Sequence, residues 1–253
     1  MEPRIMKCAC AVLLILFSSL SLLDCKKDDS SNSPQAPDAG GGETYDIQAK
    51  GIPRFVSVDY IQPEKIGRIS RFRSGIGHDY CDDFESCRSM KHYFEPKDTV
   101  DWASVRIYSP VDGIITLLVD EWAGTKIEIR SKLHPAFFFD IFHVTLANPH
   151  KTGDTLLAGE LLGHHIGSQT MSDIAIGVNV PQVGPKSTSA TGRRLVSYFD
   201  VITDLIFTNY QNRGLASRVD AVITKEARDA DTLGCTGDTF SGVGTIENWV
   251  TLH

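Results

Sequence analysis

The stretch from Val105 to Val180 is built of short apolar runs separated by turns, and this pattern limits the fold more than any other feature of the chain. Alternation of apolar and polar residues is typical of strands that bury one face. Residues Thr125–Ser131 show it, with Ile127 and Ile129 set between charged neighbours. Short strands linked by tight turns build sandwiches and barrels. The sequence therefore predicts a mainly β domain.

The strands expected in this region are joined by turns, most of which contain glycine. They are Val105–Ser109, Ile114–Glu121, Thr125–Ser131, Ala136–Leu146 and Ser172–Val180. Asp112-Gly113 lies between the first two strands and is a favoured hairpin turn. Two further turns, at Gly153-Asp154 and Gly159-Glu160, precede the last strand.

The direction of each side chain in these strands follows from their two-residue period. In Ala136–Leu146 this period places His143 on the same face as Phe137. In the last strand it places Asp173 and Ala175 together on a face of small residues, which we expect to be open.

Helical and irregular structure is expected after the last strand. Gly184–Thr191 predicts a loop, and Leu195–Arg213 predicts one amphipathic helix that covers the core. The polar face of this helix is acidic rather than basic, which favours packing on the domain over binding to a membrane surface. The remainder predicts a short strand at Ala221–Thr224 and an irregular, Gly-rich region.

Residues 1–24 predict a bacterial lipoprotein signal peptide. A basic start precedes the apolar run Ala9–Leu23, which is shorter than the ~20 residues of a membrane-spanning helix. Leu22-Leu23-Asp24-Cys25 is similar to a lipobox, although Asp24 stands where a small residue is usual. We expect lipid on Cys25 to attach an exported chain to a membrane of the bacterial cell envelope. The alternative is a plain signal peptide with an incidental Cys25.

Residues 25–47 predict a flexible tether, because they are rich in Ser, Gly, Pro and charged residues and lack apolar periodicity. The globular domain is expected over residues 48–253, with its core at about 74–180. This length is sufficient for one domain with a sizeable core.

The net charge of the chain narrows the classes of partner, and its cysteines indicate which disulfides can form. The chain has a formal net charge of −7 and no basic stripe, which argues against nucleic acid as a partner. Apart from Cys25, the chain beyond the leader contains Cys81, Cys87 and Cys235. Because an exported domain can form disulfides, we expect either Cys81–Cys87 or Cys87–Cys235.

A series of motifs between about residues 74 and 180 resembles the lysostaphin-type zinc endopeptidases, which cut peptide cross-links in bacterial cell walls. The motifs are Ser74–Gly77, His92, Tyr108–Gly113, Ile127–Ile129, Phe142–Val144, Gly153–Gly163 and the strand from Ser172. The resemblance covers under half of the chain. It implies a duplicated hybrid motif in a barrel-sandwich-like β-sheet domain, to which this chain adds a C-terminal helix and irregular region.

The resemblance also implies a metal site, since the family uses three protein ligands to hold zinc and leaves one position open for water. The first ligands come from a His-x-x-x-Asp motif, and His92 matches its histidine. Pro96 stands at the aspartate position, one residue after Glu95. A literal His-x-x-x-Asp begins at His78 but lies further upstream. His92 is thus the stronger ligand candidate, and Glu95 and His78 are weaker ones.

The two remaining motifs of the family differ in how well they match. His143 corresponds to a proton-transfer histidine and is the candidate catalytic residue. The closing His-x-His falls on Asp173-Ile174-Ala175, so Asp173 is a candidate ligand and Ala175 cannot be one. A buried Asp173 needs a partner, which His92 or His143 could provide without a metal.

These observations favour a non-catalytic, lipid-anchored envelope protein whose peptidase-like groove binds cell-wall peptide, glycan or another envelope protein. No cofactor is expected in that case. The alternative is an active zinc hydrolase that uses His92, Asp173 and His143, with Glu95 or His78 as further ligands. A third interpretation is a structural surface lipoprotein.

Overall fold

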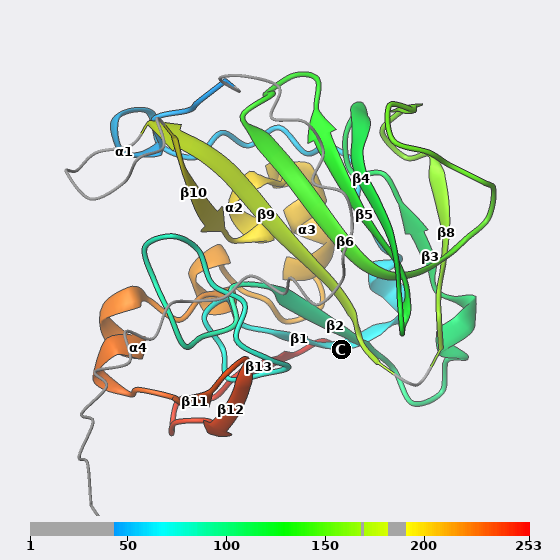
Figure 1. Cartoon of the computed structure of the whole chain (residues 1–253). Helices are drawn as coiled ribbons and strands as arrows, with labels where there is room; N and C mark the ends of the chain where they lie inside the picture. Colours follow the sequence, from blue (N-terminus) through cyan, green and yellow to red (C-terminus); the bar gives the residue numbers. More distant parts are fainter. Residues whose placement is uncertain (1–42, 168–169, 182–190) are drawn as a thin grey trace, which may run out of the picture.

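The computed structural model describes residues 43–167, 170–181 and 191–253. Its dominant element is a large, mostly antiparallel sheet, and the few helices are short (Figure 1). This confirms the predicted mainly β class. Among the described residues, none of the helices has the length and apolar character needed to span a bilayer.

The strands of the large sheet come from nearly the whole length of the domain. They are β1 (Ile66–Ser70), β2 (His92–Pro96), β3 (Arg106–Tyr108), β4 (Gly113–Glu121), β5 (Gly124–Ser131), β6 (Phe137–Leu146), β7 (Thr155–Leu156), β8 (Leu161–His165), β9 (Ser172–Pro181), β10 (Thr191–Val196) and β13 (Trp249–Thr251). The main path of neighbours is β13-β1-β2-β9-β6-β5-β4-β7. In addition, β10 pairs with β9, and β8 pairs with both β3 and β6. The strands expected between Val105 and Val180 are thus present within a few residues of their predicted bounds.

The remaining elements are short and lie around the sheet. They are α1 (Ile47–Lys50), α2 (Tyr198–Val201), α3 (Asp204–Gln211), α4 (Lys225–Ala230), the 3-10 turns η1 (Pro63–Lys65), η2 (Trp102–Ser104) and η3 (Arg218–Ala221), and the hairpin β11 (Gly234–Thr236) and β12 (Thr239–Gly242). The predicted short strand at Ala221–Thr224 is wrong, since η3 and an isolated bridge at Val222 occupy its start.

The main core lies between one face of the sheet and the helices α2 and α3. Strands β5, β6 and β9 contribute alternate apolar residues, and the helices contribute aromatic ones such as Phe199 and Tyr210. Tyr198 and Tyr210 both donate hydrogen bonds to Asp59 Oδ1, at 2.8 and 2.9 Å. Burial raises the pKa of Asp59 to about 6, against the opposing effect of these two hydroxyls.

The single helix expected over Leu195–Arg213 is wrong in its first part. Leu195 belongs to β10, where it pairs with Gly177 of β9. A helix then begins after Ser197, stops at Ile202, and restarts at Asp204. The break occurs because Ile202 is extended and bridges Val56, so strand-like pairing overrides the helical period. Most of the predicted loop Gly184–Thr191 lies outside the described residues.

Contacts with the core of the domain begin slightly before residue 48. Tyr45 packs edge-on against Phe137 at a ring distance of 5.3 Å, and its amide donates to the carbonyl oxygen of Asn179. The last residues assigned to the tether therefore belong to the domain.

A second layer covers the opposite face of the sheet. We call residues 71–91, which join β1 to β2, the covering segment. Its Phe72 and Met90 pack with Phe142, Ala175 and Leu195 in a small buried cluster. The face of small residues in β9 is therefore closed, and the expectation that it would be open is wrong.

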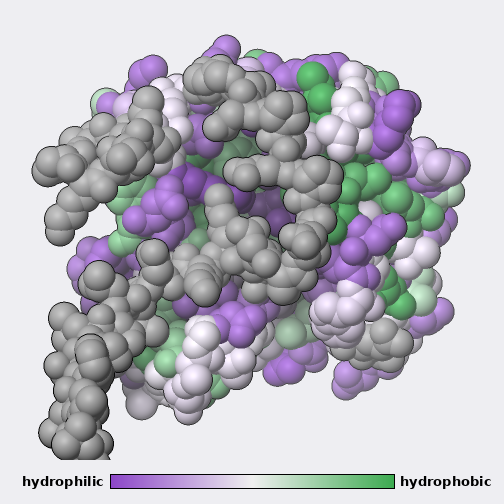
Figure 2. Space-filling model, viewed as in Figure 1, coloured by the Kyte–Doolittle hydropathy of each residue, from purple (hydrophilic) through white to green (hydrophobic). Residues whose placement is uncertain are grey.

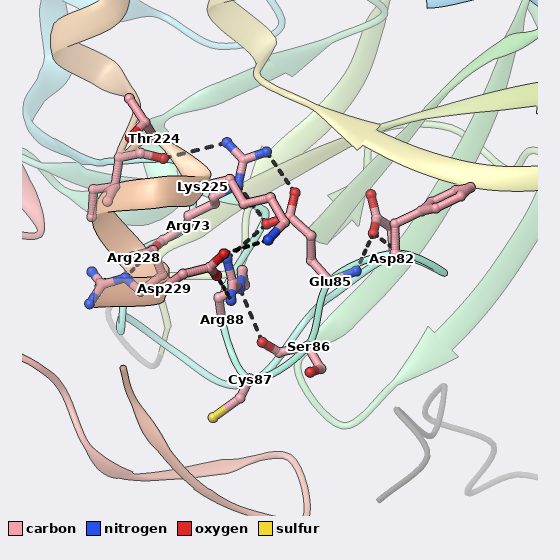
Figure 3. Close-up of polar contacts among 12 residues, drawn as sticks. Arg73, Asp82, Glu85, Ser86, Cys87, Arg88, Thr224, Lys225, Arg228 and Asp229 are labelled. Atoms are coloured by element: carbon pink, nitrogen blue, oxygen red, sulfur yellow. Dashed lines mark hydrogen bonds and ion pairs between the residues drawn. The ribbon is translucent and has the colours of Figure 1, made fainter. Parts of the chain in front are cut away.

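An ion pair (Figure 3) and a disulfide hold the covering segment to the C-terminal region. Glu85 forms ion pairs with Arg73 at 2.7 Å and with Arg88 at 2.9 Å. Arg88 also forms an ion pair with Asp229 of α4 at 2.8 Å. Cys87 and Cys235 form a disulfide, one of the two pairings that the sequence left open. The Arg88–Asp229 ion pair and the disulfide therefore both attach the covering segment to the C-terminal region.

Candidate functional site

The site is organised by a β-bulge in β6. Across the β5–β6 pair, Thr125 faces Val144 and Ile127 faces Ile141, so the single Lys126 opposes two residues, Phe142 and His143. His143 adopts a left-handed backbone conformation with φ of 64°. Bulges of this kind redirect side chains and strengthen local twist.

The bulge reverses the predicted orientation of His143. Val144 is fully buried in the main core with Phe137, whereas His143 lies beside Asp173 on the covered face. Simple alternation placed His143 with Phe137 and is wrong here, because the extra residue shifts the period by one. His143 and Asp173, both candidate site residues, are thereby brought together.

Both ring nitrogens of His143 are occupied. Nδ1 lies 3.0 Å from the Ala123 carbonyl oxygen, which only accepts, so Nδ1 carries a hydrogen. Nε2 lies 3.1 Å from Asp173 Oδ1 in an ion-pair contact that does not meet full hydrogen-bond geometry. Burial opposes the imidazolium, yet the interaction with Asp173 raises the pKa of His143 above its ordinary value.

The second partner of Asp173 is Lys91, the last residue of the covering segment. Lys91 Nζ donates to Asp173 Oδ2 at 3.0 Å, and the two side chains are 2% and 0% exposed. Burial would raise the pKa of Asp173, but the Lys91 ammonium and the His143 contact outweigh it and lower the pKa to about 2. Asp173 is therefore an ionised carboxylate held between the Lys91 ammonium and His143.

Aromatic rings and a second histidine enclose the Lys91 ammonium. Nζ lies 3.6 Å from the ring centre of Phe142 and 4.3 Å from that of Tyr80, within the range of cation–π attraction. It also lies 3.3 Å from Nε2 of His78, whose Nδ1 faces the Asp79 carbonyl oxygen at 3.1 Å. Because the Lys91 ammonium can only donate, Nε2 of His78 is the acceptor of this hydrogen bond. We call Lys91, Asp173, His143 and His78 the ammonium cluster.

A second buried carboxylate lies next to this cluster. Asp140 of β6 faces Ala175 of β9 across the sheet. Its Oδ2 accepts hydrogen bonds from Arg193 at 2.6 Å and from Tyr80 at 2.9 Å. Burial raises the pKa of Asp140, but Arg193 and Lys126 outweigh it and keep the pKa below its ordinary value.

His92, the strongest ligand candidate from the sequence, points the other way. It pairs with Ile174, whereas Tyr93 pairs with Asp173, so His92 and Asp173 project from opposite faces of the sheet. His92 Nδ1 donates to the Ser70 carbonyl oxygen, and Nε2 accepts from Ser197 Oγ, both at 2.8 Å. Burial lowers the pKa of His92 to about 4.

The other sequence candidates are placed as follows. Glu95 forms an ion pair with Arg68 at 2.7 Å, and His78 reaches Asp173 only through Lys91. Cys25 lies outside the described residues.

Zinc is the metal that the resemblance implies, and these donors do not fit it as arranged. His92 has no lone pair to spare, Ala175 has no donor, and an ammonium fills the space beside Asp173.

The structure describes no group of three or more His, Cys, Asp and Glu side chains arranged to hold a metal ion within residues 43–167, 170–181 and 191–253.

The surface next to the cluster carries an exposed tryptophan. Trp122, in the turn between β4 and β5, is 83% exposed, and its ring lies 6.5 Å from that of His143. His143 itself retains some exposure at 12%. Figure 2 shows hydrophobic residues on the right-hand side of this view, toward β4 and β8, with hydrophilic residues beside them. His143 therefore links buried Asp173 to the surface that carries Trp122.

Sequence reasoning missed several residues of this arrangement. Lys91, Tyr80 and Arg193 complete the two ionic groups, yet none stands in a recognised motif. One signal was available in the sequence, because a buried Asp173 requires a partner. The partners expected from the sequence are His92 and His143, and Lys91 is not among them.

The similarity of the chain to known solved structures is remote. No protein-family model and no curated protein matches the chain. Two solved structures are weakly similar. A putative glycyl-glycine endopeptidase lytM from Ruminococcus gnavus ATCC 29149 shares 16% identity over 41% of this chain and 42% of its own, with a TM-score of 0.28. The structure of cbpa from L. salivarius REN shares 14% identity over 28% of this chain and 46% of its own, with a TM-score of 0.23. The chain spans less than half the length of either protein.

Proposed function

We propose that this protein is a lipid-anchored protein of the bacterial cell envelope that binds a wall or envelope ligand without catalysing a reaction. The observation that carries the proposal is the Lys91 ammonium, which is buried against Asp173 at 3.0 Å. A catalytic zinc site requires protein ligands and an open position for water. A fixed cation in the ligand space repels a second cation, so zinc at Asp173 would require Lys91 to leave.

The state of His143 supports the same proposal. A general base needs a ring nitrogen free to accept a proton from a reacting group. The Ala123 carbonyl oxygen and Asp173 occupy both nitrogens of His143. His143 is better suited to support the adjacent surface than to transfer protons.

Trp122 supplies the binding surface in this proposal. An exposed indole offers a large flat apolar face with one polar edge, and such side chains are enriched at binding sites. Sugar rings and peptide groups of the wall suit this chemistry, and they are the class of ligand that the sequence resemblance favours.

Metal content tests the non-catalytic part. The purified full-length chain is incubated with excess zinc, desalted and analysed by elemental mass spectrometry, alongside Asp173→Ala. We expect no stoichiometric zinc in either protein and no cleavage of purified cell walls. Zinc near one per chain that is lost in Asp173→Ala, or wall cleavage, would overturn the proposal.

Sedimentation with insoluble cell-wall material tests the binding part. We expect Trp122→Ala to reduce the bound fraction several-fold. Leu205→Ala removes another exposed apolar side chain, 78% exposed on α3, and serves as the matched control. Equal binding by the two variants would reject Trp122 as the contact, and absence of binding by the unaltered chain would reject the wall as the ligand.

One observation favours the hydrolase alternative. His78 and Asp173 both contact Lys91, and His143 contacts Asp173. A mixed His/Asp set is acceptable to zinc. Zinc binding or wall cleavage by the unaltered chain distinguishes the two functions. Zinc binding by Lys91→Ala but not by the unaltered chain would show that the ammonium keeps a metal away from these side chains.

A further inference from the structure

A separate hollow lies between η1, η2, β3 and β8. Its volume is about 500 Å³, which falls within the range of small-molecule sites. Its lining is mostly polar and includes Gln62, Lys65, Asp101, Ser104, Arg106 and His164. None of these residues belongs to the ammonium cluster.

Arg106 and His164 form one wall of the hollow. They are directly opposite each other in the β3–β8 pair, so their side chains project from the same face as close neighbours. Arg106 is exposed, and its neighbours Val105 and Ile107 are buried in the core. Within the part of the chain that the structure describes, the Arg106 guanidinium makes no hydrogen bond or ion pair. Its donors are therefore available to a ligand.

Lys65 forms another wall. Its Nζ donates to the Ser104 carbonyl oxygen at 2.8 Å and approaches Ser104 Oγ at 3.4 Å, which fixes the ammonium above η2. No carboxylate of the described residues pairs with it. An ammonium has three donors, so at least one remains for a ligand.

The charges of the lining are unbalanced. The described lining contributes two basic side chains, Lys65 and Arg106, and one carboxylate, Asp101. This occurs in a chain whose overall charge is −7. A local positive field in a concave surface concentrates anions.

We propose that this hollow binds a small ligand through a carboxylate or phosphate group. The planar guanidinium of Arg106 is suited to bidentate contact with either oxyanion. Lys65 then supplies a second charge-assisted hydrogen bond from across the hollow, and His164 lies beside the guanidinium. The ligand is small and polar, because the hollow is open and its lining is mostly polar.

Isothermal titration of the full-length chain tests this site with inorganic phosphate, acetate and the dipeptide Ala-Ala as probes. We expect saturable binding of at least one probe with a Kd of about 1 mM or tighter. Added NaCl should weaken binding, because the attraction is electrostatic. Preference for phosphate would assign a phosphorylated ligand, and preference for Ala-Ala over acetate would assign a peptide carboxylate.

The variants Arg106→Gln and Lys65→Gln should each weaken binding about fivefold or more, a loss of about 1 kcal/mol per contact. Arg106→Lys keeps the charge but loses the planar fork, so it should fall between Arg106→Gln and the unaltered chain. Lys132→Gln removes the same charge from an exposed lysine outside the lining and should change binding less than twofold. Circular dichroism confirms that each variant is folded.

Absence of saturable binding by all three probes would overturn the proposal, as would equal affinities of Arg106→Gln and Lys132→Gln. Trp122→Ala should leave binding at this hollow unchanged. Failure of the wall-binding proposal and failure of this one are therefore distinguishable.

Discussion

Lys91 Nζ lies 3.0 Å from Asp173 Oδ2, and this buried ion pair joins the covering segment to the centre of the sheet. Lys91 immediately precedes β2, and Asp173 is the second residue of β9. Burial of such a pair has a large desolvation cost, which is offset only while both charges are present. Substitution of either residue should therefore change the free energy of unfolding strongly.

Removal of one partner should destabilise the fold strongly. We expect Lys91→Met and Asp173→Asn each to lower the free energy of unfolding by about 3–5 kcal/mol, because the remaining charge is left buried. The double variant should lose far less than the sum. Urea unfolding measures all three. Lys151→Met, in an exposed pair with Asp154, should have little effect. Additive losses would show that the pair is not coupled.

The pKa of His143 should report the same contact. Asp173 raises the pKa of His143, so the stabilisation is present below the unfolded pKa of about 6.5 and is lost as pH rises through the folded value. In Asp173→Asn the pKa should fall below that of the unaltered chain. A pH titration followed by NMR of the imidazole signals measures this. An unchanged pKa would mean that another group holds the proton.

Asp59 should make stability fall as pH rises through the acidic range. Its folded pKa of about 6 exceeds the unfolded value of about 4, so the folded state binds a proton more tightly. Stability is thus greatest below pH ~4 for this group and decreases by about 3 kcal/mol toward pH ~6. Asp59→Asn should remove this part of the slope in unfolding experiments between those pH values. Retention of the full slope would exclude Asp59 as its source.

The bulge should make position 143 selective for residues that tolerate a left-handed backbone. Asn adopts positive φ readily, whereas a β-branched residue does not. We therefore expect His143→Val to be less stable than His143→Asn by about 1–2 kcal/mol. Both variants lose the contact with Asp173, so their difference isolates the backbone. Thermal unfolding of the two proteins compares them, and equal stability would argue against the strained conformation.

Local patterning was sufficient to predict the strands but not the arrangement of the site. The alternation in β5 and β9 identified their buried faces, because each strand has one side against the main core. The same rule failed at His143, since a bulge depends on the pairing of two strands and not on either one alone. The prediction of a helix from Leu195 was wrong for a similar reason, because the start of that segment pairs with β9 as a strand.

The charged groups were harder to predict because they come from separate parts of the chain. Lys91, Asp173 and Asp140 meet only when β2, β9 and β6 lie side by side, and Arg193 joins them from β10. A motif search finds residues at fixed spacing. The two residues of an ion pair between neighbouring strands have no fixed separation in the sequence. Such pairs therefore cannot be predicted until the strand order is known.

The strand order also limits how molecules of this protein can associate. The main path of the sheet ends in β13, with three residues, and in β7, with two. Unpaired strand edges invite the addition of a further strand from another chain, and natural proteins suppress this with short or charged edges. Arg68 lies over the Trp249 ring of β13 at 4.3 Å, and β10 carries Arg193 and Arg194. Molecules crowded on one surface would therefore have little backbone available for edge-to-edge aggregation.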